Sequence, residues 1–319
     1  MILNEIGKLI SEKCNFAIIS HYSPDGDAIG SSLGLYNALK EIGKNVDIFI
    51  PDNLPNRFSY LPLFDEIKNQ KQYKENYECI LVLDCGDEDR LGEFVDILKH
   101  TDLVINIDHH ISNTLYGNIN YVDSNASSVG EIIYNLLKLN GYDISKNTAC
   151  CLYTSIISDT GGFKYSNTTS MTFNIAGDLI NTGIDFPEIN RILFDTKSVN
   201  QIKLLSLVTS TLEMHNDDKL ALIYMTRDML NKSGASEDDA SEMVNLARDI
   251  ETAEVGVFIK EIDDKVFRIS LRSKNIVDVR LIAEKFDGGG HVRAAGCTIK
   301  GDFAEVKKRL IDEILSQWK

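Results

Sequence analysis

The feature that most constrains this chain is a set of three Asp- and His-containing segments, each of which follows a short apolar run. The segments contain His21, Asp25 and Asp27, then Asp84, then residues 108–110. The apolar runs cover residues 16–19, 80–83 and 103–107. Such runs are typical of strands buried on both faces of a parallel sheet. Because ligands of open α/β sheets collect beyond the carboxyl ends of the strands, we expect the three segments to meet at one sheet edge.

The alternation of strand and helix patterns predicts an α/β fold with a doubly wound parallel sheet in the first part of the chain. From about residue 215 the pattern changes to a smaller α+β domain. It has strands at 220–225, 255–259 and 266–271, the last two forming a hairpin, and a glycine-rich loop at 287–291. We therefore expect a catalytic domain over 1–190, a linker and connecting helix over 191–214, and a substrate domain over 215–319. The active site is expected in the cleft between the two domains.

Net charge and composition narrow the class of partner. The chain of 319 residues has a formal net charge of −15 and no long basic block. Proteins that follow long duplex nucleic acid need a basic stripe, so this partner is disfavoured and a small phosphorylated substrate is favoured. No apolar stretch approaches the length of a membrane helix, and the start of the chain lacks the apolar core of a signal peptide. We expect a cytoplasmic protein that does not contact membranes, with its six cysteines as free thiols.

The residue types in the three segments indicate a site for more than one divalent metal ion. Asp25 and Asp27 lie two residues apart in a strand-to-helix loop, so they could point at two neighbouring ions that Asp84 bridges. His109 adds an imidazole, and Asp159 could complete the shell of the second ion. Carboxylates and imidazoles without thiolates suit Mn²⁺ or related octahedral metals better than structural zinc. Two such ions, roughly 3.5–4 Å apart, can clamp a phosphoryl oxygen and generate a hydroxide nucleophile.

The motif at residues 108–110, together with His21, Asp25 and Asp27, resembles the DHH phosphoesterase superfamily, which includes the exonuclease RecJ and family II pyrophosphatases. The segment 287–296 resembles the associated C-terminal substrate domain. The resemblance covers essentially the whole chain, with the motifs in the expected order. Its nearest group is that of short two-domain oligoribonucleases that also dephosphorylate 3′-phosphoadenosine 5′-phosphate.

The resemblance implies two bound Mn²⁺ ions, with Mg²⁺ or another divalent ion as the alternative. The implied ligand sets are His21, Asp25 and Asp84 for one ion, and Asp27, Asp84, His109 and Asp159 for the other. It also implies that His110 faces the substrate phosphate, and we expect Asp84 and Asp108 to join it as catalytic residues. Asp108 is expected to hold an imidazole in one tautomer from the side away from the metal.

The predicted substrate contacts lie in the second domain. Arg272 and Ser273, at the end of a predicted strand, resemble the family's contact with a substrate phosphate, which arginine can bind through two N–H groups. Gly288, Gly289 and Gly290 can bring backbone N–H groups close to an anion, and His291 adds a donor beside them. Asp287 departs from members of the superfamily that have a further glycine there, so the conformation of this loop is an open question.

The sequence thus predicts an Mn²⁺-dependent phosphodiesterase and phosphatase. Its expected substrates are very short RNA or DNA oligonucleotides (nano-RNA, pApA) and 3′-phosphoadenosine 5′-phosphate. The alternatives are a cyclic-di-AMP phosphodiesterase and a catalytically inactive nucleotide-binding sensor, whereas a pyrophosphatase is less favoured. Cleavage polarity and the presence of a homodimer are left open.

Overall fold

A computed structural model describes residues 2–240 and 243–318. Residues 1, 241, 242 and 319, which belong to the predicted domains, lie outside the described residues. The chain divides into two compact units, Met1–Thr196 and Lys197–Lys319. Within the described residues, none of the helices has both the length and the apolar character that crossing a membrane would require. The predicted fold class, a parallel doubly wound domain followed by a smaller α+β domain, is confirmed.

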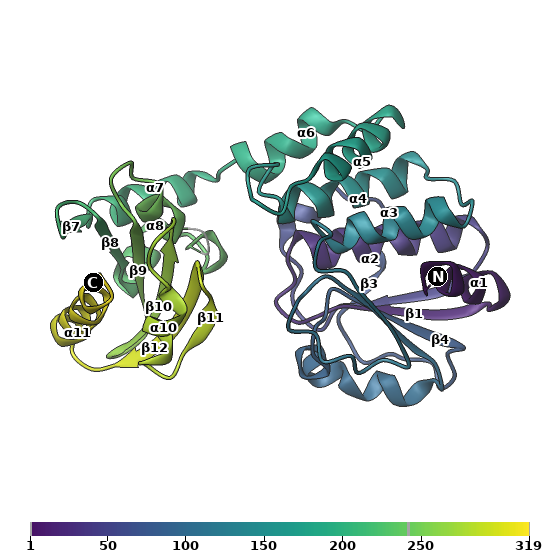
Figure 1. The fold of residues 1–319 in the computed structure, drawn as a ribbon, viewed down its shortest axis with the longest axis horizontal. Coiled ribbons are helices and arrows are strands. Elements are labelled where there is room, and N and C mark those ends of the chain that lie inside the picture. The colour runs from purple at the N-terminus through teal and green to yellow at the C-terminus, as the bar shows by residue number, and fades with distance from the viewer. Residues whose placement is uncertain (1, 241–242, 319) are drawn as a thin grey trace. The chain divides into compact units, whose positions relative to one another are not determined.

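The first unit is built on a six-stranded sheet with the strand order β3-β2-β1-β4-β5-β6, in which all neighbouring strands are parallel (Figure 1). Its strands are β1 Asn15–Ile19, β2 Asn45–Phe49, β3 Ile67–Lys68, β4 Cys79–Leu83, β5 Val104–Asp108 and β6 Ile119–Val122. The three apolar runs of the sequence become β1, β4 and β5. These strands are direct neighbours, so their carboxyl ends lie side by side.

Helical segments cover both faces of this sheet. The α-helices are α1 Ile2–Glu12, α2 Gly26–Glu41, α3 Val129–Leu139, α4 Lys146–Asp159, α5 Ser170–Asn181 and α6 Phe186–Asn190. The remaining helical turns are η1 Asn56–Phe58, η2 Phe64–Glu66, η3 Glu88–His100 and η4 Arg191–Asp195. Alternate β1 side chains enter different cores: Phe16 and Ile18 pack with residues of α2, α3 and α4, whereas Ala17 and Ile19 pack with residues of η3. Burial on both faces explains why the strands are continuous apolar runs.

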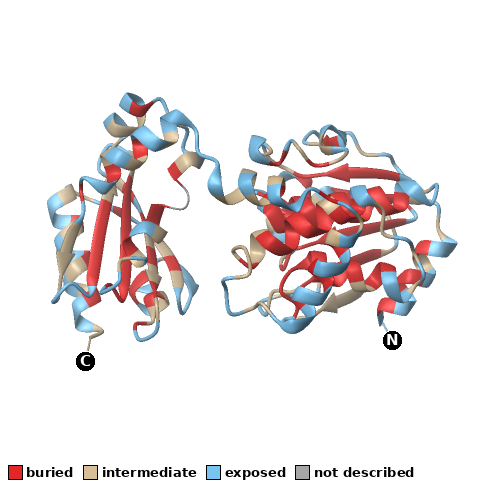
Figure 2. Ribbon diagram, turned by 90° about the horizontal axis from the view of Figure 1, so that it is seen from above, coloured by how far each residue is buried: buried red, intermediate tan, exposed pale blue. Residues whose placement is uncertain are grey.

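The second unit has a mixed six-stranded sheet with the order β11-β12-β10-β9-β8-β7. Its strands are β7 Glu213–His215, β8 Leu220–Met225, β9 Val255–Asp263, β10 Val266–Ser273, β11 Gly289–His291 and β12 Ala294–Lys300. Its helical segments are α7 Val199–Thr209, α8 Arg227–Ser233, η5 Asp238–Ala240, α9 Met243–Arg248, α10 Val279–Glu284 and α11 Phe303–Ser316. The predicted hairpin is present, because β9 and β10 pair antiparallel. In both units the central strands are mostly buried, and in the first unit so is most of α2 (Figure 2).

One local prediction for this unit needs correction. The glycine-rich segment, expected as a loop, forms β11, which pairs with β12 through Gly289–Gly296, Gly290–Ala295 and His291–Ala294. The backbones approach closely, since a Cβ on Gly290 would lie 2.5 Å from the carbonyl oxygen of Ala294. The small residues of both segments therefore serve strand pairing.

Candidate metal centre

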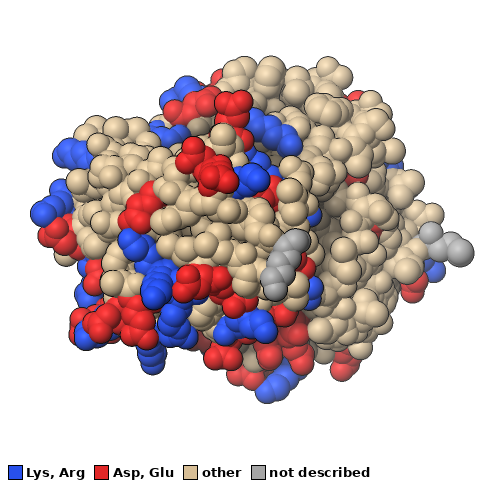
Figure 3. Space-filling view, turned by 60° about the vertical axis from the view of Figure 1, so that its left-hand side comes forward, with Lys and Arg blue, Asp and Glu red and all other residues tan. Residues whose placement is uncertain are grey.

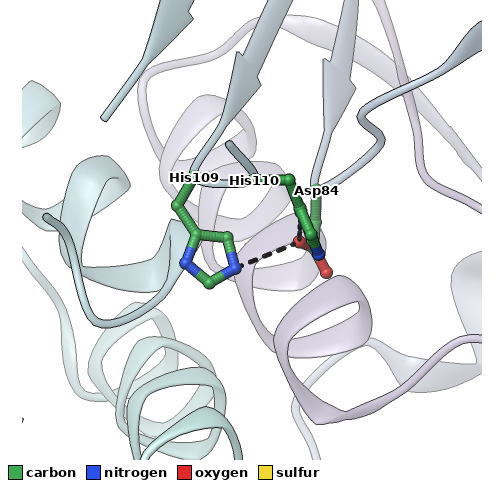
Figure 4. A group of neighbouring side chains, drawn as sticks. All are labelled: Asp84, His109 and His110. Atoms are coloured by element: carbon green, nitrogen blue, oxygen red, sulfur yellow. Dashed lines mark ion pairs between the residues drawn. The ribbon is translucent and has the colours of Figure 1, made fainter. Parts of the chain in front are cut away.

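The carboxyl ends of β1, β4 and β5 bring the three polar segments together, as the sequence predicts. His21 follows β1, Asp84 directly follows β4, and Asp108 is the last residue of β5. Asp84 has a φ of 54°, a left-handed conformation that aspartate tolerates better than most side chains do. Both imidazoles of the 108–110 segment are directed toward the carboxylate of Asp84 (Figure 4).

Three groups of ligand atoms at this edge are close enough to hold cations. The first is His21, Asp25 and Asp84, the second is Asp27, His109 and Asp159, and the third, Asp84, His109 and His110, shares one residue with each of the others. In the second group Nε2 of His109 lies 3.7 Å from Oδ2 of Asp27 and 3.6 Å from Oδ2 of Asp159. The same nitrogen lies 3.7 Å from Oδ1 of Asp84, so Asp84 adjoins both the first and the second group.

The environment of Asp84 shows that these residues fit bound cations. Its Oδ1 atom is buried and has no hydrogen-bond partner among the described residues. Burial raises the pKa of Asp84 well above its usual value, and the charges of Asp27 and Asp25 raise it further. A buried, unpartnered oxygen among other carboxylates is costly unless positive charge compensates it. Divalent cations bound by the first two groups would supply that charge.

Asp27 is fixed by hydrogen bonds from two neighbouring helices. Its Oδ2 accepts the N–H of Val129 at 2.7 Å, and its Oδ1 accepts the N–H of Gly130 at 3.2 Å, both at the start of α3. The hydroxyl of Ser155 on α4 also donates to Oδ1. The carboxylate is thereby fixed by a helix N-terminus, where negative charge is favoured.

His21 is prepared to act as a neutral ligand. Its Nδ1 lies 2.7 Å from the carbonyl oxygen of Tyr22, a contact that places a proton on Nδ1 and leaves the lone pair on Nε2. That Nε2 lies 3.5 Å from Oδ2 of Asp84. Burial lowers the pKa of His21, which favours the neutral imidazole that metal binding requires.

Asp108 acts on His110, as expected for a carboxylate that fixes an imidazole. Nδ1 of His110 lies 2.8 Å from Oδ1 of Asp108 but 3.5 Å from Oδ1 of Asp84. Nδ1 therefore forms its hydrogen bond with Asp108, which leaves Nε2 as the ring nitrogen that can contact a substrate. Burial alone would raise the pKa of Asp108, but hydrogen bonds from His110 and from Asn113 at 2.6 Å outweigh it and lower the pKa. The bond to Asp108 in turn raises the pKa of His110.

The predicted substrate residues all lie in the second unit. Arg272 and Ser273 end β10, but Ser273 is buried and its hydroxyl donates to the carbonyl oxygen of Val277 at 2.7 Å. His291 is exposed at the end of β11. Asp287 has a φ of 55°, a conformation that glycine adopts without strain and that aspartate tolerates better than most residues do. Their roles as substrate contacts remain predictions.

Three residues that the sequence analysis did not single out contact the centre: Ser155, Asn113 and Arg90. The sequence could have indicated Ser155, because this residue lies four positions before Asp159 on the same helix and therefore on the same helix face as Asp159. Asn113 lies in an irregular segment after β5, and Arg90 lies in the first turn of η3, where the sequence has no apolar periodicity that indicates which side chains turn inward.

A parallel α/β sheet whose strand ends carry carboxylates and imidazoles that could hold metal ions is the frame for comparing this chain with known proteins. A sequence model of the DHH family, N-terminal domain, matches residues 15–156, and one of the DHHA1 domain matches residues 217–319. The chain belongs to the DHH phosphoesterase family, whose members depend on divalent metals, and it is an enzyme that acts on phosphoesters.

Relatives resemble the chain over nearly its whole length. The bifunctional oligoribonuclease and PAP phosphatase NrnA of Thermus thermophilus is 33% identical, over 93% of this chain and 88% of the relative. The protein of the same name from Bacillus subtilis is 32% identical, with 92% of each chain covered. The crystal structure of an exopolyphosphatase-related protein from Bacteroides fragilis matches with a TM-score of 0.92 at 31% identity, covering 98% of this chain and 95% of the other.

Proposed function

We propose that this enzyme hydrolyses very short oligonucleotides, such as nano-RNA and pApA, and 3′-phosphoadenosine 5′-phosphate, with two Mn²⁺ ions as cofactors. The observation that carries the proposal is the pair of adjoining carboxylate–imidazole groups at one sheet edge. Support for the substrate class comes from relatives named as bifunctional oligoribonucleases and PAP phosphatases, which match more than nine tenths of the chain.

The orientation of Asp84 supports two ions rather than one. Its Oδ2 faces His21 of the first group, at 3.5 Å, and its Oδ1 faces His109 of the second, at 3.7 Å. One carboxylate thus presents one oxygen to each group. When bound, two divalent cations lower the pKa of a water molecule and neutralise charge on phosphoryl oxygens. Oxygen- and nitrogen-donor groups without thiolates support Mn²⁺ as the metal.

The contacts of His110 support a role in proton transfer. Its Nδ1 is taken by Asp108, so Nε2 is the atom that can donate to a phosphoryl or leaving-group oxygen. The hydrogen bond to Asp108 raises the pKa of His110, which favours the protonated imidazole that this role needs. Asn113 holds Asp108 from the other side through its amide, so the carboxylate and imidazole keep one orientation.

The second unit is proposed to bind a phosphate that is not being cleaved. Arg272 at the end of β10 and His291 at the end of β11 carry N–H donors on the two strands that flank β12, and Gly288, Gly289 and Gly290 directly precede His291. On the face shown in Figure 3, acidic and basic side chains are interspersed and form no continuous basic band. Together with the net charge of −15, this distribution supports small substrates over long duplex nucleic acid.

The test is Mn²⁺-dependent turnover on four substrates: 3′-phosphoadenosine 5′-phosphate, linear pApA, a five-nucleotide RNA and cyclic-di-AMP. The proposal expects release of product from the first three and little from the cyclic compound. Preference for cyclic-di-AMP would assign the enzyme to breakdown of that messenger instead. Absence of turnover on all four, with Mn²⁺ binding intact, would contradict catalysis on these nucleotides and favour a sensor.

A further inference from the structure

Arg90 lies at the rim of the metal centre. It belongs to η3, whose N-cap Asp87 comes three residues after Asp84, and its backbone carbonyl accepts the N–H of Tyr22 at 2.9 Å. Its Nη2 lies 3.0 Å from Nδ1 of His21, and its guanidinium lies 6.0 Å from the centre of the Tyr22 ring. The loops after β1 and β4 thus hold this half-buried cation beside a predicted metal ligand.

The contact with His21 does not give the guanidinium N–H groups of Arg90 a hydrogen-bond acceptor once His21 binds a metal. A guanidinium has only N–H donors, so it can bond to Nδ1 only when that nitrogen carries no proton. Nδ1 of His21 also lies 2.7 Å from the carbonyl oxygen of Tyr22, which needs the proton on Nδ1. When Nε2 of His21 binds a metal, the Nδ1–H faces Tyr22 and Arg90 loses its acceptor.

Arg90 also lacks an anionic partner within the part of the chain that the structure describes. None of the five aspartates that adjoin the centre forms an ion pair with it: Asp25, Asp27, Asp84, Asp108 and Asp159. Among the imidazoles of the centre, the one that its guanidinium contacts is that of His21. A half-buried guanidinium with donors to spare is a binding group for a planar or tetrahedral oxyanion.

We infer that Arg90 binds the phosphoryl group under attack, donating N–H groups to its non-bridging oxygens. The inference rests on the proposed function, in which a phosphoester lies at this centre, and adds a residue that stabilises the developing negative charge. The ligand class is a phosphate monoester or diester, and inorganic phosphate shares the same oxygens. No bond to Arg90 forms or breaks.

The experiment compares Arg90→Gln and Arg90→Lys with the unchanged protein and with Lys99→Gln. Lys99 is an exposed cation of the same segment that pairs only with Asp96 among the described side chains, so its replacement controls for loss of one charge. Calorimetry measures Mn²⁺ binding alone, then binding of inorganic phosphate to the Mn²⁺-loaded protein. Turnover of pApA is measured on the same samples.

We expect Arg90→Gln to weaken phosphate binding about 10- to 100-fold and to lower kcat/KM for pApA at least as much, as loss of a charged hydrogen bond predicts. Arg90→Lys should keep part of the phosphate affinity, and Lys99→Gln all of it. Mn²⁺ affinity should stay within about twofold, since Nδ1 of His21 keeps Tyr22 as its partner.

Unchanged phosphate affinity in Arg90→Gln would overturn the inference. Equal losses of Mn²⁺ and phosphate affinity in both Arg90 variants would also overturn it, because Arg90 would then act by positioning His21. Phosphate binding does not depend on which nucleotide is cleaved. A failure of the proposed substrate class would therefore appear in the turnover panel alone and leave this measurement interpretable.

Discussion

The hydroxyl of Ser155 donates a 2.5 Å hydrogen bond to Oδ1 of Asp27 and so connects α4 to α2 behind the metal centre. Both side chains are buried, and the same carboxylate accepts two N–H groups from the start of α3. Three helices thus fix one predicted metal ligand. The centre depends on this packing as well as on the sheet edge.

Replacing Ser155 by alanine should weaken metal binding, because one of the bonds that orient Asp27 is lost. We expect Mn²⁺ affinity, measured by calorimetry, to fall about 10- to 100-fold, the usual effect of removing a group that orients a ligand. Ser32→Ala is the matched control, since Ser32 is a buried serine of α2 whose hydroxyl has no partner in the described structure. Wild-type Mn²⁺ affinity in Ser155→Ala would refute the orienting role.

A methyl group at Gly130 should disturb the same contact sterically. A Cβ there would lie 2.0 Å from Oγ of Ser155, so α3 and α4 would have to separate. We expect Gly130→Ala to lower the free energy of unfolding by about 1–3 kcal/mol, measured by urea denaturation. Gly177→Ala on α5 is the control: its Cβ meets no atom within 4 Å, and gain of helix propensity should stabilise the protein slightly. Equal behaviour of the two variants would contradict the packing argument.

Replacing Asp84 by asparagine should stabilise the metal-free fold and abolish the effect of bound metal. Asparagine tolerates the left-handed φ of 54° at this position, so the backbone should be retained. The variant removes a buried charge that burial and neighbouring carboxylates disfavour, so the metal-free protein should melt at a higher temperature than the wild type. Turnover should be abolished, and Mn²⁺ should no longer raise the melting temperature as it does for the wild type. Retained turnover would show that Asp84 does not bridge the ions.

The stability of the metal-free protein should fall with rising pH because of Asp159. Burial, followed by the charge of Asp27, raises the pKa of Asp159 from 3.8 to about 7 in the folded state. A raised folded pKa gives stability that is complete below the unfolded pKa, about 4, and is lost as pH rises through about 7. Asp159→Asn removes this loss, so its advantage over the wild type should grow across that window, up to about 4 kcal/mol.

The measurement is urea denaturation in a chelator at several pH values between about 4 and 8, with the exposed Asp143→Asn as control. With excess Mn²⁺ the order should reverse, since the bound metal stabilises the Asp159 carboxylate. A constant difference between wild type and Asp159→Asn in chelator would contradict the assigned pKa shift.

Much of the site could be predicted because strand ends are marked in the sequence. The apolar runs before His21, Asp84 and Asp108 fixed three neighbouring strands, and parallel strands end at one edge. The glycine-rich segment was harder to predict: the same small residues suit a loop at an anion or close pairing of two strands, and only the partner strand β12 decides.

Local order in the sequence determined the fold class, the residue types of the candidate metal centre and the sheet edge where they meet, because strand and helix periods are short-range patterns. Tertiary structure alone decided which partners surround each ligand. Ser155 reaches Asp27 across 128 residues and Arg90 reaches His21 across 69, so these contacts exist only after distant segments pack. Burial likewise sets the pKa of Asp84 and Asp159, since desolvation depends on the whole surrounding structure and on no single stretch of sequence.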